Sequence, residues 1–233
     1  MGCSKKNDTS IGNTIFNLRS DQDSVLADGA KLVNLTCELN PDATVDRRNI
    51  LFKTTGGQFL ESKDTTVEVK AQFVDQKLIA KAIFQVSQSP GVVIISAQPN
   101  LPDQKNNNYV LKDTIFLVPS IPASLKLSAN APAVIAGYLS EVTITGQLAN
   151  NAGSNVSLGN HVLFEEIVAG SATAIGTFRA INASSNKDGQ VSAIYSIGAA
   201  SAGAKVLLRC TLLRDNGART DTLDNLALNI ITK

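Results

Sequence analysis

Apolar residues recur at every second position along most of this chain, and this spacing limits its possible folds more than any other feature. In LVNLTCEL, the side chains of Val33, Leu35, Cys37 and Leu39 fall on one face, with polar side chains opposite. Such alternation is typical of a β-strand with one buried face. The Ala and Lys residues of VEVKAQFV and KLIAKAIFQV leave a helix there as a minor alternative. We therefore expect an all-β protein.

The alternating segments predict a similar series of strands in each half of the chain. In the first half they are 13–18, 32–39, 49–55, 66–74, 77–87, 92–98 and 109–118. In the second half they are 124–129, 140–148, 161–168, 174–183, 190–198, 204–213 and 221–231. The turn signals between them include Asp28-Gly29, Gly56-Gly57, Pro90-Gly91, Asp188-Gly189 and Asn216-Gly217. Both residues of Asn216-Gly217 tolerate positive φ, so we expect a tight hairpin there. Short strands at this spacing predict β-sandwiches.

The two halves share landmarks at matching distances. Phe164 lies 112 residues after Phe52, and Gly203 lies 112 residues after Gly91. A duplicated module of about one domain's length is the simplest explanation.

The same pattern predicts where the domains begin and end. We expect a flexible, polar N-terminal tether over residues 1–19, one sandwich over 20–120 and a second over 121–233. The segment VPSIPASLK, with its two prolines, predicts a short and fairly stiff linker between the sandwiches.

These landmarks resemble bacterial immunoglobulin-like domains of the invasin/intimin group. The shared pattern is A-D-G, an alternating strand, V-x-F-x-T before glycine, and A-G before another alternating strand. In the first half it corresponds to Ala27-Asp28-Gly29, Leu35–Leu39, Ile50-Leu51-Phe52, Thr54-Thr55-Gly56-Gly57 and Pro90-Gly91. The second half matches less closely, with Ile135-Ala136-Gly137, Val162-Leu163-Phe164, Asp188-Gly189 and Ala202-Gly203. The resemblance covers most of residues 20–233. It implies two tandem immunoglobulin-like β-sandwiches that serve as a spacer or adhesive module on a bacterial surface.

Composition argues against nucleic acid and, less strongly, against sugar as a partner. The net charge of +1 provides no long-range field for nucleic acid. The chain has no Trp and only 3 Tyr, whereas sugar and single-strand nucleic-acid sites commonly use aromatic platforms. We therefore expect no nucleic-acid partner.

The N-terminal segment MGCSKKNDTS resembles the start of a mature bacterial lipoprotein, with Cys3 as the lipidated residue. Met1 would then replace a removed leader, and the polar residues would form a flexible arm. Several acyl chains anchor a protein stably, because each buried methylene contributes about 0.8 kcal/mol. Two alternatives stay open. Gly2 could be myristoylated beside a palmitoylated Cys3, although Lys6 stands where that pattern has Ser or Thr, or the cysteine could be incidental. The lipoprotein interpretation predicts a partner membrane through lipid on Cys3, and a location in the bacterial envelope, at the outer membrane or cell surface.

The other two cysteines, Cys37 and Cys210, lie on the apolar faces of predicted strands. We expect two buried free thiols that act as small apolar side chains. Since they fall in different halves, neither half can form an internal disulfide across its sandwich.

No constellation of residues predicts catalysis. His161 is the single histidine and opens a predicted strand. Glu165 and Glu166 are adjacent, so on a strand they point to opposite faces and cannot act together on one substrate. We expect a protein that is not an enzyme and has no cofactor.

Acidic residues gather at two predicted turns. They are Asp21, Asp23, Asp28, Asp42 and Asp46. Calcium between tandem sandwiches would use such oxygen ligands, but the dense, regular spacing of an EF-hand is absent. We expect solvated turn residues and no metal site.

Polar, Asn-rich loops over 98–108 and 149–160 are the candidate partner contacts, with plain solvated connectors as the alternative. Within them we single out Gln98, Asn100, Asn106, Asn107, Asn108, Asn150, Asn151 and Asn155. The sequence thus predicts a non-catalytic module for adhesion, scaffolding or spacing, with a protein or envelope-glycan partner. The alternative is a carbohydrate-binding accessory protein of a surface glycan system, against which the low aromatic content counts.

Overall fold

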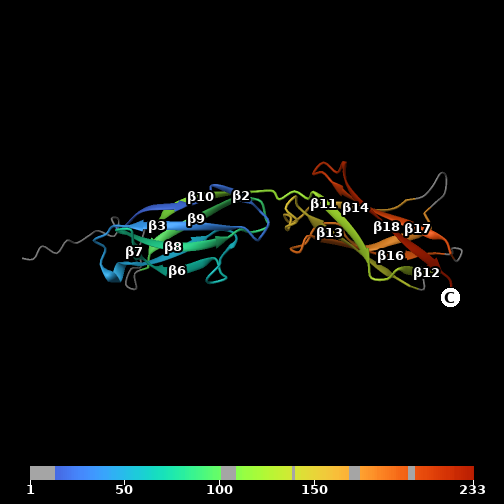
Figure 1. The fold of residues 1–233 in the computed structure, drawn as a ribbon, viewed down its shortest axis with the longest axis horizontal. Helices are drawn as coiled ribbons and strands as arrows, with labels where there is room; N and C mark the ends of the chain where they lie inside the picture. The colour runs from blue at the N-terminus through green and yellow to red at the C-terminus, as the bar shows by residue number, and fades with distance from the viewer. Residues whose placement is uncertain (1–13, 101–108, 138–139, 168–173, 199–202) are drawn as a thin grey trace, which may run out of the picture. The chain divides into compact units, whose positions relative to one another are not determined.

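A computed structural model describes residues 14–100, 109–137, 140–167, 174–198 and 203–233. The all-β prediction is confirmed, because the described residues form strands and a single helical turn, Val45–Arg47. The chain divides into two compact units, Met1–Val118 and Pro119–Lys233, which we call unit 1 and unit 2. In Figure 1, unit 1 runs from blue to green and unit 2 from yellow-green to red.

Unit 1 is built from two β-sheets. One has the strand order β1-β3-β8-β5, with β7 also paired to β8, and the other has the order β2-β10-β9-β4-β6. Their bounds are β1 Ile15–Ser20, β2 Ser24–Leu26, β3 Leu32–Leu39, β4 Asn49–Thr54, β5 Gln58–Phe59, β6 Thr66–Lys70, β7 Gln72–Val74, β8 Lys77–Gln85, β9 Gly91–Pro99 and β10 Leu111–Val118. The inward side chains of both sheets form one apolar cluster, which includes Phe52, Phe59 and Phe84.

Unit 2 is also built from two sheets. Their strand orders are β11-β13-β16-β15 and β12-β18-β17-β14. The bounds are β11 Ser124–Ala129, β12 Ala133–Ile135, β13 Val142–Ala149, β14 Val162–Ile167, β15 Gly176–Asn182, β16 Gln190–Ile197, β17 Lys205–Leu213 and β18 Arg219–Ile231. Its core cluster includes Phe164 and the fully buried Tyr195.

The first two strands are arranged in the same way in both units. In each, a first strand pairs in one sheet, and a short second strand then crosses to pair in parallel with the last strand of the other sheet. An aspartate on that last strand also binds the first strand: Asp113 Oδ2 accepts a hydrogen bond from the Ser20 amide at 2.7 Å, and Asp224 Oδ2 from the Leu127 amide at 2.8 Å. These bonds join the two sheets of each unit along one edge.

The A-D-G motif, Ala27–Gly29, forms the turn that follows β2 in unit 1. Ala27 and Asp28 are buried, and Asp28 Oδ1 accepts hydrogen bonds from the amides of Ala30 and Lys31, each at 2.9 Å. Gly29 has a φ of 75°, a left-handed conformation that favours glycine. The motif is therefore a turn element.

The predicted burial of both cysteines is confirmed. Cys37 and Cys210 are each 0% exposed and free. Burial, with smaller contributions from Glu38 and Asp224 respectively, raises the pKa of each thiol to about 12. Neither thiol has the electropositive, partly exposed surroundings of a reactive cysteine.

Several boundaries differ from the sequence predictions. The predicted strand 13–18 occurs as β1, Ile15–Ser20, which pairs with β3, so the expected tether over residues 1–19 overlaps the first strand of unit 1. Ser120, placed in the first sandwich, is buried in unit 2, where its amide donates to Ser157 Oγ at 2.8 Å. The predicted strand 66–74 is interrupted at the buried Ala71, so β6 and β7 join different sheets.

The Asn216-Gly217 turn also differs in geometry. Only Gly217 has a positive φ, at 79°. The Gly217 amide donates to the Arg214 carbonyl, and the Arg214 amide donates to the Ala218 carbonyl, each at 2.8 Å. The loop is therefore a three-residue hairpin with a glycine at the left-handed position, instead of a two-residue turn.

Candidate partner-binding surfaces

The first predicted contact loop is only partly in the described structure. Gln98 is half-buried in β9 and pairs with Leu51, so it belongs to a sheet and not to a loop. Asn100 follows β9, and its side-chain amide donates to Glu68 Oε2 at 2.8 Å. Asn106, Asn107 and Asn108 lie outside the described residues, as does Cys3.

In the second loop, Asn150 has an internal role that the sequence prediction missed. Its side chain is buried, and its Oδ1 accepts hydrogen bonds from the amides of Ala152 and Ser154, each at 3.0 Å. Its Nδ2 donates to Ser120 Oγ at 3.0 Å. Asn150 therefore orders the loop from inside, with its side chain buried. Asn151 and Asn155 are exposed, and a partner could reach them.

The titratable residues considered for catalysis each contact a different partner and form no common site. His161 Nδ1 lies 2.9 Å from Ser184 Oγ at an exposed bridge between the two residues. Glu165 binds Arg219, whereas Glu166 Oε2 accepts a hydrogen bond from the Tyr195 hydroxyl at 2.7 Å. The expectation that the two glutamates point in different directions is confirmed.

Asp21, Asp28 and Asp46 use their carboxylates in hydrogen bonds within the protein. Asp21 Oδ1 accepts from the Asn34 amide at 3.0 Å, and Asp21 Oδ2 accepts from the Asn34 side chain at 2.6 Å. A hydrogen bond with Thr44 lowers the pKa of Asp46. Across the described ranges, no group of three or more His, Cys, Asp or Glu residues is placed to hold a metal ion.

A polar hollow lies on the outer face of the β13–β16 sheet in unit 2. Its volume is about 480 Å³. Its lining is neutral and consists mainly of hydroxyl and amide side chains: Thr143, Thr145, Asn182, Ser184, Asn186, Gln190, Val191 and Ser192. One wall follows a bulge in β15, where Ala180 has a positive φ of 46° and the register shifts. The hollow could bind a neutral, hydroxyl-rich ligand through hydrogen bonds alone.

An apolar surface on unit 1 was also missed by the sequence prediction. Phe116 of β10 and Val92 of β9 are direct ladder partners and are 52% and 59% exposed. Both residues fall in predicted strands, but the sequence does not show that their side chains point outward or that the two strands become neighbours.

Known structures with the same fold include a bacterial adhesin. The similarity to the Yersinia pseudotuberculosis adhesin InvE has a TM-score of 0.50 at 14% identity, and it covers 94% of this chain and 60% of that chain. The D0-D1 domain of intimin matches with a TM-score of 0.32 at 14% identity, covering 92% of this chain and 98% of that one. A β-glycosidase from Bacteroides vulgatus matches with a TM-score of 0.38 at 13% identity, covering 91% of this chain and 24% of that one. No protein-family model matches the sequence, and no curated protein sequence matches it.

The InvE similarity confirms the fold expected from the invasin/intimin resemblance. The chain is all-β, with the immunoglobulin-like architecture of that adhesin. It spans less than two thirds of the InvE chain. At this level of identity the similarity concerns the fold alone.

Proposed function

We propose that this protein is a non-catalytic, lipid-anchored module of the bacterial cell envelope, whose immunoglobulin-like units serve adhesion, scaffolding or spacing. The observation that carries the proposal is the combination of a sandwich fold shared with an adhesin and the N-terminal segment MGCSKK. The described part of the chain contains no helix long and apolar enough to cross a membrane. Lipid on Cys3 would supply the membrane attachment.

The anchor is tested by mass spectrometry of the N-terminal peptide from protein made in its native host. Acylation of Cys3, with partition into a detergent phase that Cys3→Ala abolishes, supports the anchor. An N-terminal peptide that begins with unmodified Met1, from protein that stays in the aqueous phase, refutes it.

The absence of catalysis is also part of the proposal. The two adjacent glutamates have structural partners, since Glu165 binds Arg219 and Glu166 binds Tyr195. A hydrolase activity that survives His161→Ala and is lost with Glu166→Gln, in a variant that stays folded, would refute it.

A second candidate function, glycan binding, is favoured by the hollow in unit 2. Its neutral lining matches the hydrogen-bonding groups of sugars, although it lacks the aromatic platform that sugar sites commonly use. A glycan array probed with the intact protein and with Ser192→Tyr tests this function, because Ser192 lines the hollow and a tyrosine would fill part of it. Binding that the substitution removes supports the function, and equal signals from both proteins count against this site.

A further inference from the structure

One end of the β2–β10–β9 sheet in unit 1 carries a continuous apolar surface. We call it the apolar patch, and it consists of Leu26, Val92, Ile94, Phe116 and Val118. The register makes it continuous: Phe116 pairs with Val92, and Val118 pairs with Leu26. Ile94 lies two positions after Val92 on the same outward face. Ladder partners on one face are in side-chain contact range.

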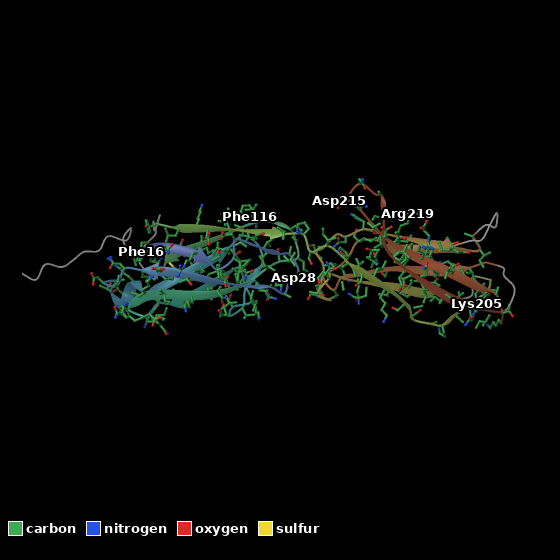
Figure 2. The ribbon with its side chains drawn as sticks, turned by 45° about the horizontal axis from the view of Figure 1, so that its top comes forward. Phe16, Asp28, Phe116, Lys205, Asp215 and Arg219 are labelled. Carbon is green, nitrogen blue, oxygen red and sulfur yellow. The ribbon has the colours of Figure 1, made fainter. Side chains whose placement is uncertain are left out.

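Exposed apolar residues occupy part of this surface in both units, since Leu207 and Ile231 of unit 2, 38% and 47% exposed, lie at the positions of Ile94 and Val118. The units differ at the pair Val92 and Phe116. In unit 2, the corresponding first outward pair of the last two strands is Lys205 and Asn229. Figure 2 labels Phe116 and Lys205 on their respective units. Isolated exposed apolar side chains are common, but a contiguous group on one sheet face marks an interaction surface.

A basic row borders the apolar patch. Lys112 of β10 pairs with Ser96 of β9, and Ser96 pairs with Lys53 of β4, so the two lysines lie on the same outward face. Both lysines are exposed. Such a border favours a partner with negative charge beside its apolar contact.

The charge and composition of this surface distinguish between possible occupants. A second copy of the chain, related by a two-fold axis through the apolar patch, would set each lysine border against the far end of the other patch and would offer the lysines no carboxylates of that patch. Exposed Phe and aliphatic side chains beside Lys would also suit an anionic membrane surface, so vesicle binding is one of the outcomes that would overturn the proposal.

We propose that the apolar patch and its lysine border bind a protein segment that presents apolar side chains beside carboxylates. The inference deepens the binding part of the proposed function and does not depend on lipid at Cys3. Phe116 and Val92 would supply the buried centre of the interface, while Lys53 and Lys112 would pair with the partner's carboxylates at its rim.

The test uses two synthetic peptides and the amide chemical shifts of the full-length protein. In one peptide Phe and Leu alternate with Glu, and in the other every Glu is replaced by Lys. We expect the Glu peptide to bind at least about tenfold more tightly, a difference of about 1.4 kcal/mol, with shifts centred on β9 and β10. The double substitution Val92→Lys with Phe116→Asn, which copies the pair in unit 2, should weaken binding by at least about tenfold.

Phe16→Asn is the matched control, because Phe16 is 58% exposed on β1 and lies outside the apolar patch. It should leave the affinity unchanged. Equal affinity for both peptides, or equal loss with Phe16→Asn, would overturn the proposal. So would a concentration-dependent dimer in sedimentation, or binding to phosphatidylserine vesicles, that the double substitution removes. If the peptide result is negative while Cys3 is acylated, this proposal fails and the anchor stands.

Discussion

Glu166 should contribute more to the stability of unit 2 than its neighbour Glu165, because its carboxylate connects the two sheets. It lies on β14, and it accepts hydrogen bonds from the Tyr195 hydroxyl at 2.7 Å and from the amides of Ile175 and Gly176 at 3.0 Å. Tyr195 lies on β16 of the other sheet and is 0% exposed.

The expected magnitudes follow from those contacts. A hydrogen bond to a charged group contributes about 1.5–3 kcal/mol, and such contributions are not additive within one network. We expect Glu166→Ala to lower the free energy of unfolding by about 3 kcal/mol, since Glu166 is half-buried and water can replace part of its bonding. Tyr195→Phe, which removes only the hydroxyl, should cost about 1.5 kcal/mol.

The control is Glu165→Ala. Glu165 is 23% exposed and pairs with Arg219, which is 56% exposed and lies in the same sheet, so the pair does not connect the two sheets. An ion pair with one exposed partner contributes about 1 kcal/mol or less. Urea unfolding of the full chain, followed through amide signals of unit 2, measures all three variants. A double-mutant cycle for Glu166→Ala and Tyr195→Phe should give a coupling energy of about 1 kcal/mol. Equal losses for the two glutamates, or no coupling, would refute the argument that Glu166 connects the sheets.

Three further predictions concern the core and the turns. Cys37 and Cys210 should not react with a disulfide reagent at pH 8 unless urea is added, and Cys210→Val should reduce the loss of stability between pH 9 and 12. The sign follows from the pKa, which burial raises from 9.0 to about 12: the unfolded thiol ionises first, so stability falls as pH rises. Asp224→Ala should cost about 1.5 kcal/mol in urea unfolding, because the Leu127 amide loses its charged acceptor, whereas an unchanged midpoint would contradict the inter-sheet role. Gly57→Ala should lower the melting temperature by several degrees, since a Cβ there would lie 2.5 Å from a backbone carbonyl and φ is 73°; an unchanged temperature would show that the turn relaxes.

The strands that alternation predicted best are those with one apolar and one polar face. Residues 32–39 and 124–129 were assigned as they occur in β3 and β11. The short strands β2, β5 and β12 were missed, because two or three residues are too few to show a period. Their pairing depends on tertiary position, which alternation does not encode.

The expected exposure of Asn150 is wrong for a different physical reason. Asn-rich composition marks a segment as a loop but does not show which amides are used inside it. Asn150 is buried among the backbone groups that it binds, whereas Asn151, the next residue, is exposed. Conversely, Val92 and Phe116 were treated only as strand residues, because their shared exposure depends on which strands become neighbours.

Comparing the last two strands of each unit distinguishes the residues that the core requires from the residues that are free to take part in binding. Inward positions of the last two strands are apolar in both units, as Ile95 and Leu208 show, since each sandwich must fill its core. Outward positions are free to differ, and at corresponding ladder pairs unit 1 has Val92 and Phe116 while unit 2 has Lys205 and Asn229. A chain in which the units were spacers only would have no need of an apolar outward pair, which favours association. Leu207 and Ile231 make the neighbouring outward positions of unit 2 apolar too, so the difference between the units is this one pair. We therefore assign the proposed binding to unit 1, and exchanging the two pairs between the units should transfer peptide binding to unit 2 only if the lysine border is moved as well.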